Sequence, residues 1–190
     1  FFTATDDFSS SNDAGAGMLG TIEFNSATLY RYANVAVHDF CRQIGDTGMV
    51  VNALKLFIEA FAKSMPTGKA NTFANQTLPQ AVLVCLRQDR PVSLVSAFER
   101  PIRSSDGYVE QSIKRLVDEY ENVKQWVEEP ICAFSLGIEN FAGNQGGFNE
   151  LLEQLNEKLN ELIVLDRCSR GERALVSRIA IQIGIHQRVQ

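Results

Sequence analysis

Strand-like and helix-like patterns of apolar residues alternate along the chain, and their order limits the folds that it can adopt. Residues 21–38 alternate with period two, and residues 81–87 and 131–136 are continuous apolar runs that predict buried strands. Helical spacing follows each strand: between Asp46 and Pro66, from Asp106 to Glu129, and from Phe148 onward. This order predicts an α+β fold, in which helices cover one face of a sheet.

The ends of these elements carry recognisable signals. Asp46 and Asp106 are typical N-caps for the helices that follow them, and Pro66 is expected to stop the first helix. Residues 91–102 predict a short helix followed by a loop. A ferredoxin-like order needs βαββαβ, so the chain would be that motif without its first strand and helix. The missing strand would leave a sheet edge that something must cover.

Composition gives broader limits. The length of 190 residues fits one domain. The formal net charge of −5 argues against indiscriminate nucleic-acid binding. A local basic groove remains possible. The four cysteines lie far apart and form no CxxC pair, and the sequence shows no signal peptide and no apolar run long enough to span a membrane. We expect a cytoplasmic protein without metal or other cofactors. Because it begins at Phe1, inside a motif, we expect a fragment that lacks an N-terminal portion.

The first twenty residues form a polar arm with apolar ends. Residues 6–20 are rich in Asp, Ser, Asn, Gly and Ala, which predicts an exposed loop. Residues 15–20 match the GxGxxG dinucleotide fingerprint. That fingerprint needs a preceding strand and a following helix whose N-terminus binds the pyrophosphate. Here a loop precedes and a strand follows, so we interpret the glycines as those of a hairpin.

The arm and the strand after it carry a resemblance. Residues 2–7 read Phe-Thr-Ala-x-Asp-Asp, and residues 19–34 read Leu-Gly-Thr-x-Glu-Phe-x-Ser-x-x-x-Tyr-Arg-Tyr-Ala-Asn. This pattern resembles the C-terminal portion of the backbone subunit (CasC family) of type I-E CRISPR Cascade complexes, and the likeness continues to about residue 140. It implies a thumb-like hairpin arm over 1–20, a modified RRM-like core over 21–140, and a divergent region over 141–190.

The resemblance also implies residues that contact RNA. Residues 97–100, Ala-Phe-Glu-Arg, followed by Asp-Gly at 106–107, are similar to the Ala-Phe-Glu-Lys and Asp-Gly of the family, where basic residues bind the guide RNA backbone. Arg103 matches one such lysine, and Ser105 stands where a second one occurs. The implied RNA-binding residues are Lys69, Arg100, Arg103 and Ser105. The implied thumb residues, which would wedge into a guide–target duplex, are Phe1, Phe2, Thr3, Thr5, Met18 and Leu19.

The resemblance therefore implies a structural protein that polymerises head to tail along CRISPR guide RNA and presents it to target DNA beside other Cascade subunits. No catalytic residue is predicted. The alternative is a ferredoxin-like endonuclease that processes CRISPR RNA and uses His38 as acid or base. A third hypothesis is an oligomer without nucleic acid. Residues 166–190 carry five arginines against two acidic residues and favour a solvated extension, although alternating isoleucines at 179–185 leave a strand possible.

Overall fold

The computed structural model describes residues 27–65, 67, 70–74, 76–141, 143, 146–168 and 180–189, with backbone alone for 72–73, 164–168 and 180–189. Within these residues the chain is α+β, with a four-stranded sheet in the order β1-β4-β2-β3 in which every neighbouring pair is antiparallel. The strands are β1 (Ala27–Ala36), β2 (Ala81–Arg87), β3 (Cys132–Leu136) and β4 (Ala180–Val189). The helices are α1 (Val37–Ile44), α2 (Thr47–Lys63), α3 (Ala70–Phe73), the 3-10 turn η1 (Val95–Phe98), α4 (Val109–Val123) and α5 (Phe148–Cys168). None of the described helices is long and apolar enough to cross a membrane.

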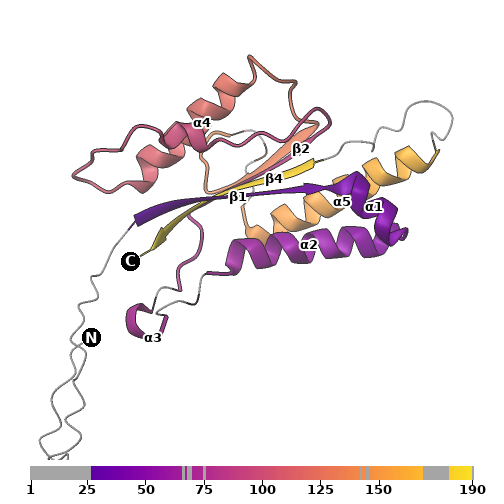
Figure 1. Cartoon of the computed structure of the whole chain (residues 1–190), viewed down its shortest axis with the longest axis horizontal. Coiled ribbons are helices and arrows are strands. Elements are labelled where there is room, and N and C mark those ends of the chain that lie inside the picture. Colours follow the sequence, from indigo (N-terminus) through magenta and orange to yellow (C-terminus); the bar gives the residue numbers. More distant parts are fainter. Residues whose placement is uncertain are drawn as a thin grey trace, which may run out of the picture.

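Helices cover both faces of the sheet, so the prediction of helices on one face is wrong. Figure 1 shows α4 on one side of the strands and α2 with α5 on the other. Every residue of β2 is buried, and its alternate side chains supply the two layers: Val82, Val84 and Leu86 pack on one side, Leu83 and Cys85 on the other. Helical periodicity specifies an apolar stripe but not which face of a sheet will bury it.

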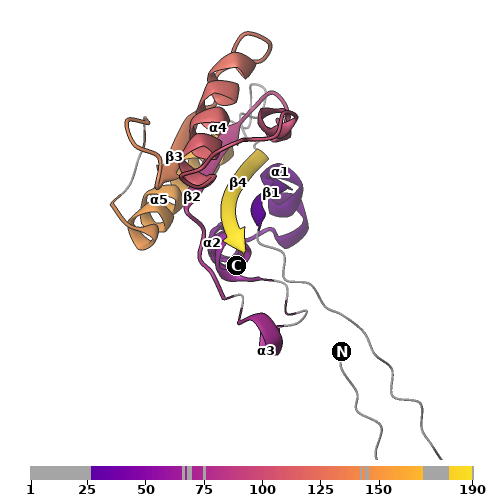
Figure 2. The same ribbon diagram turned by 90° about the vertical axis from the view of Figure 1, so that its left-hand side faces the viewer.

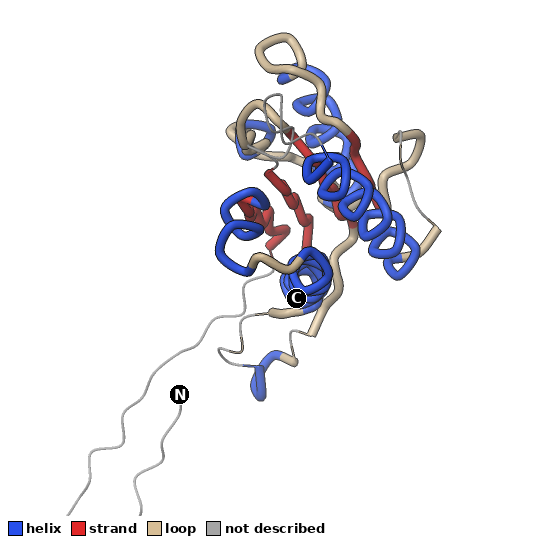
Figure 3. Tube along the Cα trace, turned by 90° about the vertical axis from the view of Figure 1, so that its right-hand side faces the viewer, coloured by secondary structure: helices blue, strands red, loops and turns tan. Residues whose placement is uncertain are grey.

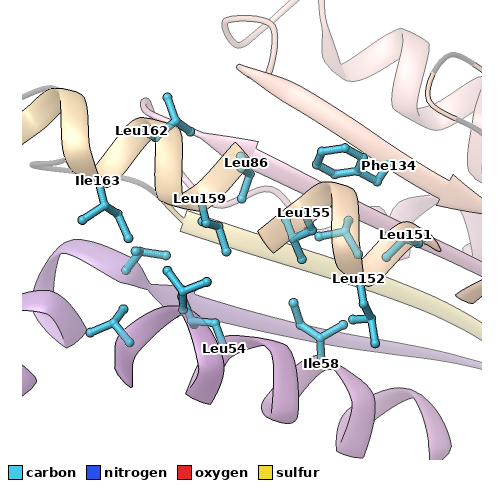
Figure 4. Packing of buried hydrophobic residues seen from close by; sticks show 14 of the residues in the cluster. Leu54, Ile58, Leu86, Phe134, Leu151, Leu152, Leu155, Leu159, Leu162 and Ile163 are labelled. Carbon is cyan, nitrogen blue, oxygen red and sulfur yellow. The ribbon is translucent and has the colours of Figure 1, made fainter. Parts of the chain in front are cut away.

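The α2/α5 face holds the larger core. Leu54 and Ile58 of α2 meet a ladder of leucines from α5, and both helices lie on β2 and on Phe134 of β3 (Figure 4). Leu155, in the middle of α5, is 1% exposed. The predicted cap of α2 is confirmed, because the Asp46 carboxylate accepts a hydrogen bond of 2.8 Å from the Met49 amide.

The α4 face holds a smaller cluster. Leu116 and Tyr120 of α4 pack on Leu83 and Cys85, together with Leu94 from the segment before η1. Burial raises the pKa of the Cys85 thiol to about 12, as expected for a reduced core cysteine.

β4 lies inside the sheet rather than at its edge. Its backbone pairs with β1 from Ala27↔Val189 to Ala36↔Ala180. On its other side it pairs with β2 from Ala81↔His186 to Arg87↔Ala180 (Figure 2). Residues 180–189 therefore adopt the strand that the alternating isoleucines left open, and they do not form a solvated extension. The same strand occupies the edges that β1 and β2 would otherwise expose.

Three boundaries differ from the sequence predictions. The strand predicted to reach His38 ends at Ala36, because Val37–Ile44 forms α1. α4 begins at Val109 with Tyr108 as its N-cap, so Asp106 does not cap it. The loop predicted around Asn71 contains the single turn α3, which lies apart from the sheet in Figures 1 and 3.

Candidate nucleic-acid interface

The predicted arginine loop runs over the start of β1 and is held there by a buried anchor. Leu94, 2% exposed, lies in the α4-face cluster, and its amide donates a 3.1 Å hydrogen bond to the Tyr30 hydroxyl of β1. η1 follows at once and directs the chain outward toward the loop. Burial raises the pKa of the Tyr30 hydroxyl, which therefore stays protonated while it accepts this bond.

Arg100 and Arg103 lie on this loop with exposed side chains. The guanidinium of Arg115, from α4, donates to the Arg100 carbonyl and fixes the backbone beneath the Arg100 side chain. A fixed backbone with a free cationic side chain suits contact with phosphate, because less conformational freedom is lost on binding. Arg115 has a positioning role here that the sequence did not suggest.

The end of the loop is a tight turn into α4. The Ser104 hydroxyl accepts a 3.1 Å bond from the Asp106 amide, and Gly107 adopts φ 101°, a backbone angle that favours glycine. Ser105 is exposed on this turn. Ser112, one turn into α4, donates its hydroxyl to the Tyr108 carbonyl at 2.6 Å. The turn therefore holds Arg103 and Ser105 with both residues exposed.

The other predicted contacts cannot be placed. Lys69 and the six thumb residues Phe1, Phe2, Thr3, Thr5, Met18 and Leu19 lie outside the described residues. The chain that leads from them enters the described structure at Ala27, which lines the same hollow as Arg100. Within the described residues, the start of β1 and the arginine loop therefore meet at this hollow.

His38, the residue of the endonuclease alternative, lies elsewhere. It follows β1 on α1, and its Nε2 is 3.6 Å from an Asp39 carboxylate oxygen. Its Nδ1 is buried and has no hydrogen-bond partner within the described part of the chain. At about 3.3 Å per residue, the ten-residue strand β1 puts roughly 30 Å between His38 and the end of β1 beneath the arginine loop. The structure does not bring His38 and the arginines together.

Arg87 is a buried arginine with a structural environment. It is 3% exposed, and its Nη2 lies 2.8 Å from the Asp89 carboxylate and 2.5 Å from the Glu128 carbonyl. Two arginine nitrogens on one carboxylate make a strong charge-assisted pair. Arg87 joins the turn after β2 to the chain after α4 and has no donor facing outward for a nucleic acid.

The α+β fold, with helices on both faces of an antiparallel sheet, is shared with solved structures. One similar chain belongs to a "CRISPR RNA-guided surveillance complex", with a TM-score of 0.71, 32% sequence identity, and coverage of 83% of this chain and 63% of that one. Another, from a "CRISPR RNA-guided surveillance complex, pre-nicking", has a TM-score of 0.59 and 20% identity over 70% of this chain and 47% of that one, and it supports the fold alone. The chain therefore spans less than two thirds of either.

The family is shown by a direct sequence match. The model of the Cas_CT1975 family, described as CT1975-like protein, matches residues 1–163, and the chain belongs to that family. The match extends beyond residue 140, where the resemblance ends, and includes most of α5, but it stops before β4. No curated protein matches the chain.

Proposed function

We propose that this chain is an RNA-binding backbone subunit of a type I-E Cascade complex, similar to CasC, which holds CRISPR guide RNA for pairing with target DNA. The observation that carries the proposal is the 32% identity and 0.71 TM-score to a chain of a CRISPR RNA-guided surveillance complex. The exposed Arg100 and Arg103 give that likeness a physical basis at one end of the sheet. Contacts of this kind bind phosphate, and base pairing then supplies the sequence specificity.

The same proposal covers assembly. Copies of the chain associate head to tail along the RNA and contact other Cascade subunits in the cytoplasm, on an RRM-like core with the residue 1–20 arm as a thumb. The subunit binds RNA without cleaving it. No observation favours the His38 endonuclease, and a gel of guide RNA incubated with the protein tests it: cleavage that disappears in His38→Ala would replace our proposal.

The salt dependence of RNA binding tests the role of the loop. Arg103→Glu is expected to weaken binding of a guide-length RNA and to reduce the slope of log affinity against log salt by about one, because one phosphate contact and its released counterion are lost. Fluorescence anisotropy between 50 and 300 mM salt, roughly the range in which such slopes are steep, measures both.

Lys114→Glu is the matched control, since it makes the same charge change at an exposed position on α4 outside the loop. It should leave the slope close to that of the unmodified protein. Equal slopes for Arg103→Glu and the unmodified protein would remove Arg103 from the interface, and a protein that binds no RNA would contradict the proposed function itself.

A further inference from the structure

A hollow of about 420 Å³ lies on the α4 face beside the arginine loop. Its floor is the start of β1, its walls are η1 and the loop after it, and its far side is the first turn of α4. Two stretches that are distant in the sequence, residues 27–30 and 95–112, thus meet there. The volume is within the range of small-ligand sites, about 300–1,000 Å³.

Aromatic rings form much of the lining. Tyr30 and Phe98 lie with ring centroids 5.4 Å apart at an interplanar angle of 42°. The hydrogen bond from the Leu94 amide to the Tyr30 hydroxyl holds one of these rings in place. Tyr108 lines the hollow from the start of α4 and is 51% exposed. An exposed ring beside a fixed aromatic pair is a stacking platform for a planar group, and every nucleobase has such a face.

The polar groups of the hollow suit a nucleotide. Arg100 is the one charged side chain among the described residues that line it. Thr28 lines the hollow from the start of β1, but its Oγ1 is buried and does not face the open space. The group that suits a nucleotide is the Arg100 guanidinium, which can bind a phosphate.

Two neighbouring hollows differ from this one in the charged side chains that line them. The hollow between η1 and α4 is lined by three carboxylates, of Glu99, Asp118 and Glu119, against the guanidinium groups of Arg100 and Arg115. The hollow between α4 and β3 is lined by the carboxylates of Glu121 and Glu129 against the amine of Lys124. Carboxylates at those positions repel a phosphate. Among the described residues, no carboxylate lines the hollow beside β1. Of these three open hollows, it is the one whose electrostatics accept an anionic nucleotide.

We infer that this hollow, here named the β1 hollow, binds one unstacked nucleobase of a single-stranded RNA, with Tyr108 stacked on the base and Arg100 on an adjoining phosphate. The inference rests on the proposed RNA binding and adds to it a site for a base. The interaction is sequence-tolerant, because stacking and phosphate contact do not distinguish the bases.

The test uses the full chain and a single-stranded RNA of mixed sequence that carries 2-aminopurine. Tyr108→Ala should weaken binding about 5- to 100-fold, the range for loss of one base–aromatic stack, and should reduce the quenching of 2-aminopurine. The salt slope should be unchanged, since Tyr108 carries no charge. Tyr108→Phe keeps the ring and should restore affinity. Trp126→Ala, at the other end of α4 and 87% exposed, is the control aromatic and should bind as the unmodified protein does.

The outcomes separate the two proposals. RNA that binds with the expected salt slope, yet with equal affinity and quenching in Tyr108→Ala, overturns the β1 hollow and leaves the proposed function intact. Failure of the unmodified protein to bind RNA contradicts both. If Tyr108→Ala instead reduces self-association in sedimentation without changing RNA affinity, the hollow binds a protein segment and the inference is wrong.

Discussion

The two faces of the sheet share the strand β2 but differ in how completely helices cover it. On the α2/α5 face, two long helices pack their leucines on alternate residues of β2 and form a closed core. On the α4 face, one helix and a 3-10 turn cover the other residues, and open hollows remain along α4. The same strand thus supports a core that supplies stability and a less covered face that has room for a ligand.

This difference explains where the candidate interface lies. A site needs exposed side chains held on a rigid support. The arginine loop has such a support because Leu94 is buried in the α4-face cluster while Arg100, six residues later, is exposed. On the opposite face, the leucines of α5 and the inward residues of α2 are buried in the core. Function on one face therefore depends on stability supplied by the other.

The largest expected effect tests whether the α2/α5 face is more tightly packed than the α4 face. Leu155→Ala, in the α5 ladder, should lower the free energy of unfolding by about 3–5 kcal/mol, because the cavity forms between two helices that cannot close around it. Leu116→Ala, on the α4 face, should cost about 2–3 kcal/mol, since the neighbouring hollows let the site collapse. Urea denaturation of the two variants measures both. Equal losses, or a larger loss for Leu116→Ala, would contradict the view that the two faces differ in closure.

The sequence predicted the parts that follow from local pattern. The strand over residues 81–87 has the predicted ends because a continuous apolar run can only be buried on both sides, and the Asp46 cap follows from its position before an apolar stripe. The helix α1 was missed although Val37, Phe40, Cys41 and Ile44 have helical spacing, because Val35 and Val37 also continue the alternation of β1. Asp106 failed as a cap because Gly107, at φ 101°, separates it from the helix.

The candidate site was predicted only in part for a different reason. Arg100 and Arg103 were found through a linear resemblance, which needs no knowledge of the fold. The β1 hollow joins Thr28, Phe98 and Tyr108, and these meet only because β4 lies between β1 and β2 and sets their spacing. Strand order is a long-range property, and period-two patterns do not specify it. Aromatic residues near both the strand start and the Asp-Gly turn were the available signal.

A smaller effect on the free energy of unfolding should appear at alkaline pH, where one thiol from each face loses its proton in the unfolded chain before it does so in the folded protein. Burial raises the pKa of Cys85, on the α4 face, from an ordinary value of 9.0 to about 12, and that of Cys132, on the α2/α5 face, to about 11. A raised folded pKa means that the stabilisation is complete below pH 9 and is lost as the pH rises toward the folded pKa. Each thiol should therefore reduce the free energy of unfolding by about 1 kcal/mol between pH 8 and pH 10.

Single replacements isolate the two contributions. Cys85→Ala and Cys132→Ala should each flatten the pH dependence by a similar amount up to pH 10, whatever their stability at pH 8, because both folded pKa values lie above that range. Chemical denaturation at pH 8, 9 and 10 gives the profiles. If Cys85→Ala left the slope of unfolding free energy against pH unchanged, water would reach the core of the α4 face. The two faces would then differ in how well they exclude water.

The smallest effect concerns the hydrogen bond that joins the arginine loop to the sheet. Tyr30→Phe removes the acceptor of the Leu94 amide and should lower the free energy of unfolding by about 0.5–1.5 kcal/mol, the usual range for one intramolecular hydrogen bond. Tyr32→Phe, two residues along the same strand, is the matched control and should cost less. Because the bond positions the loop, Tyr30→Phe should also weaken RNA binding more than its stability loss alone explains, as anisotropy at a temperature well below unfolding would measure. A variant that loses stability but keeps full affinity would mean that the loop is positioned by Arg115 and Leu94 packing, with no contribution from the strand.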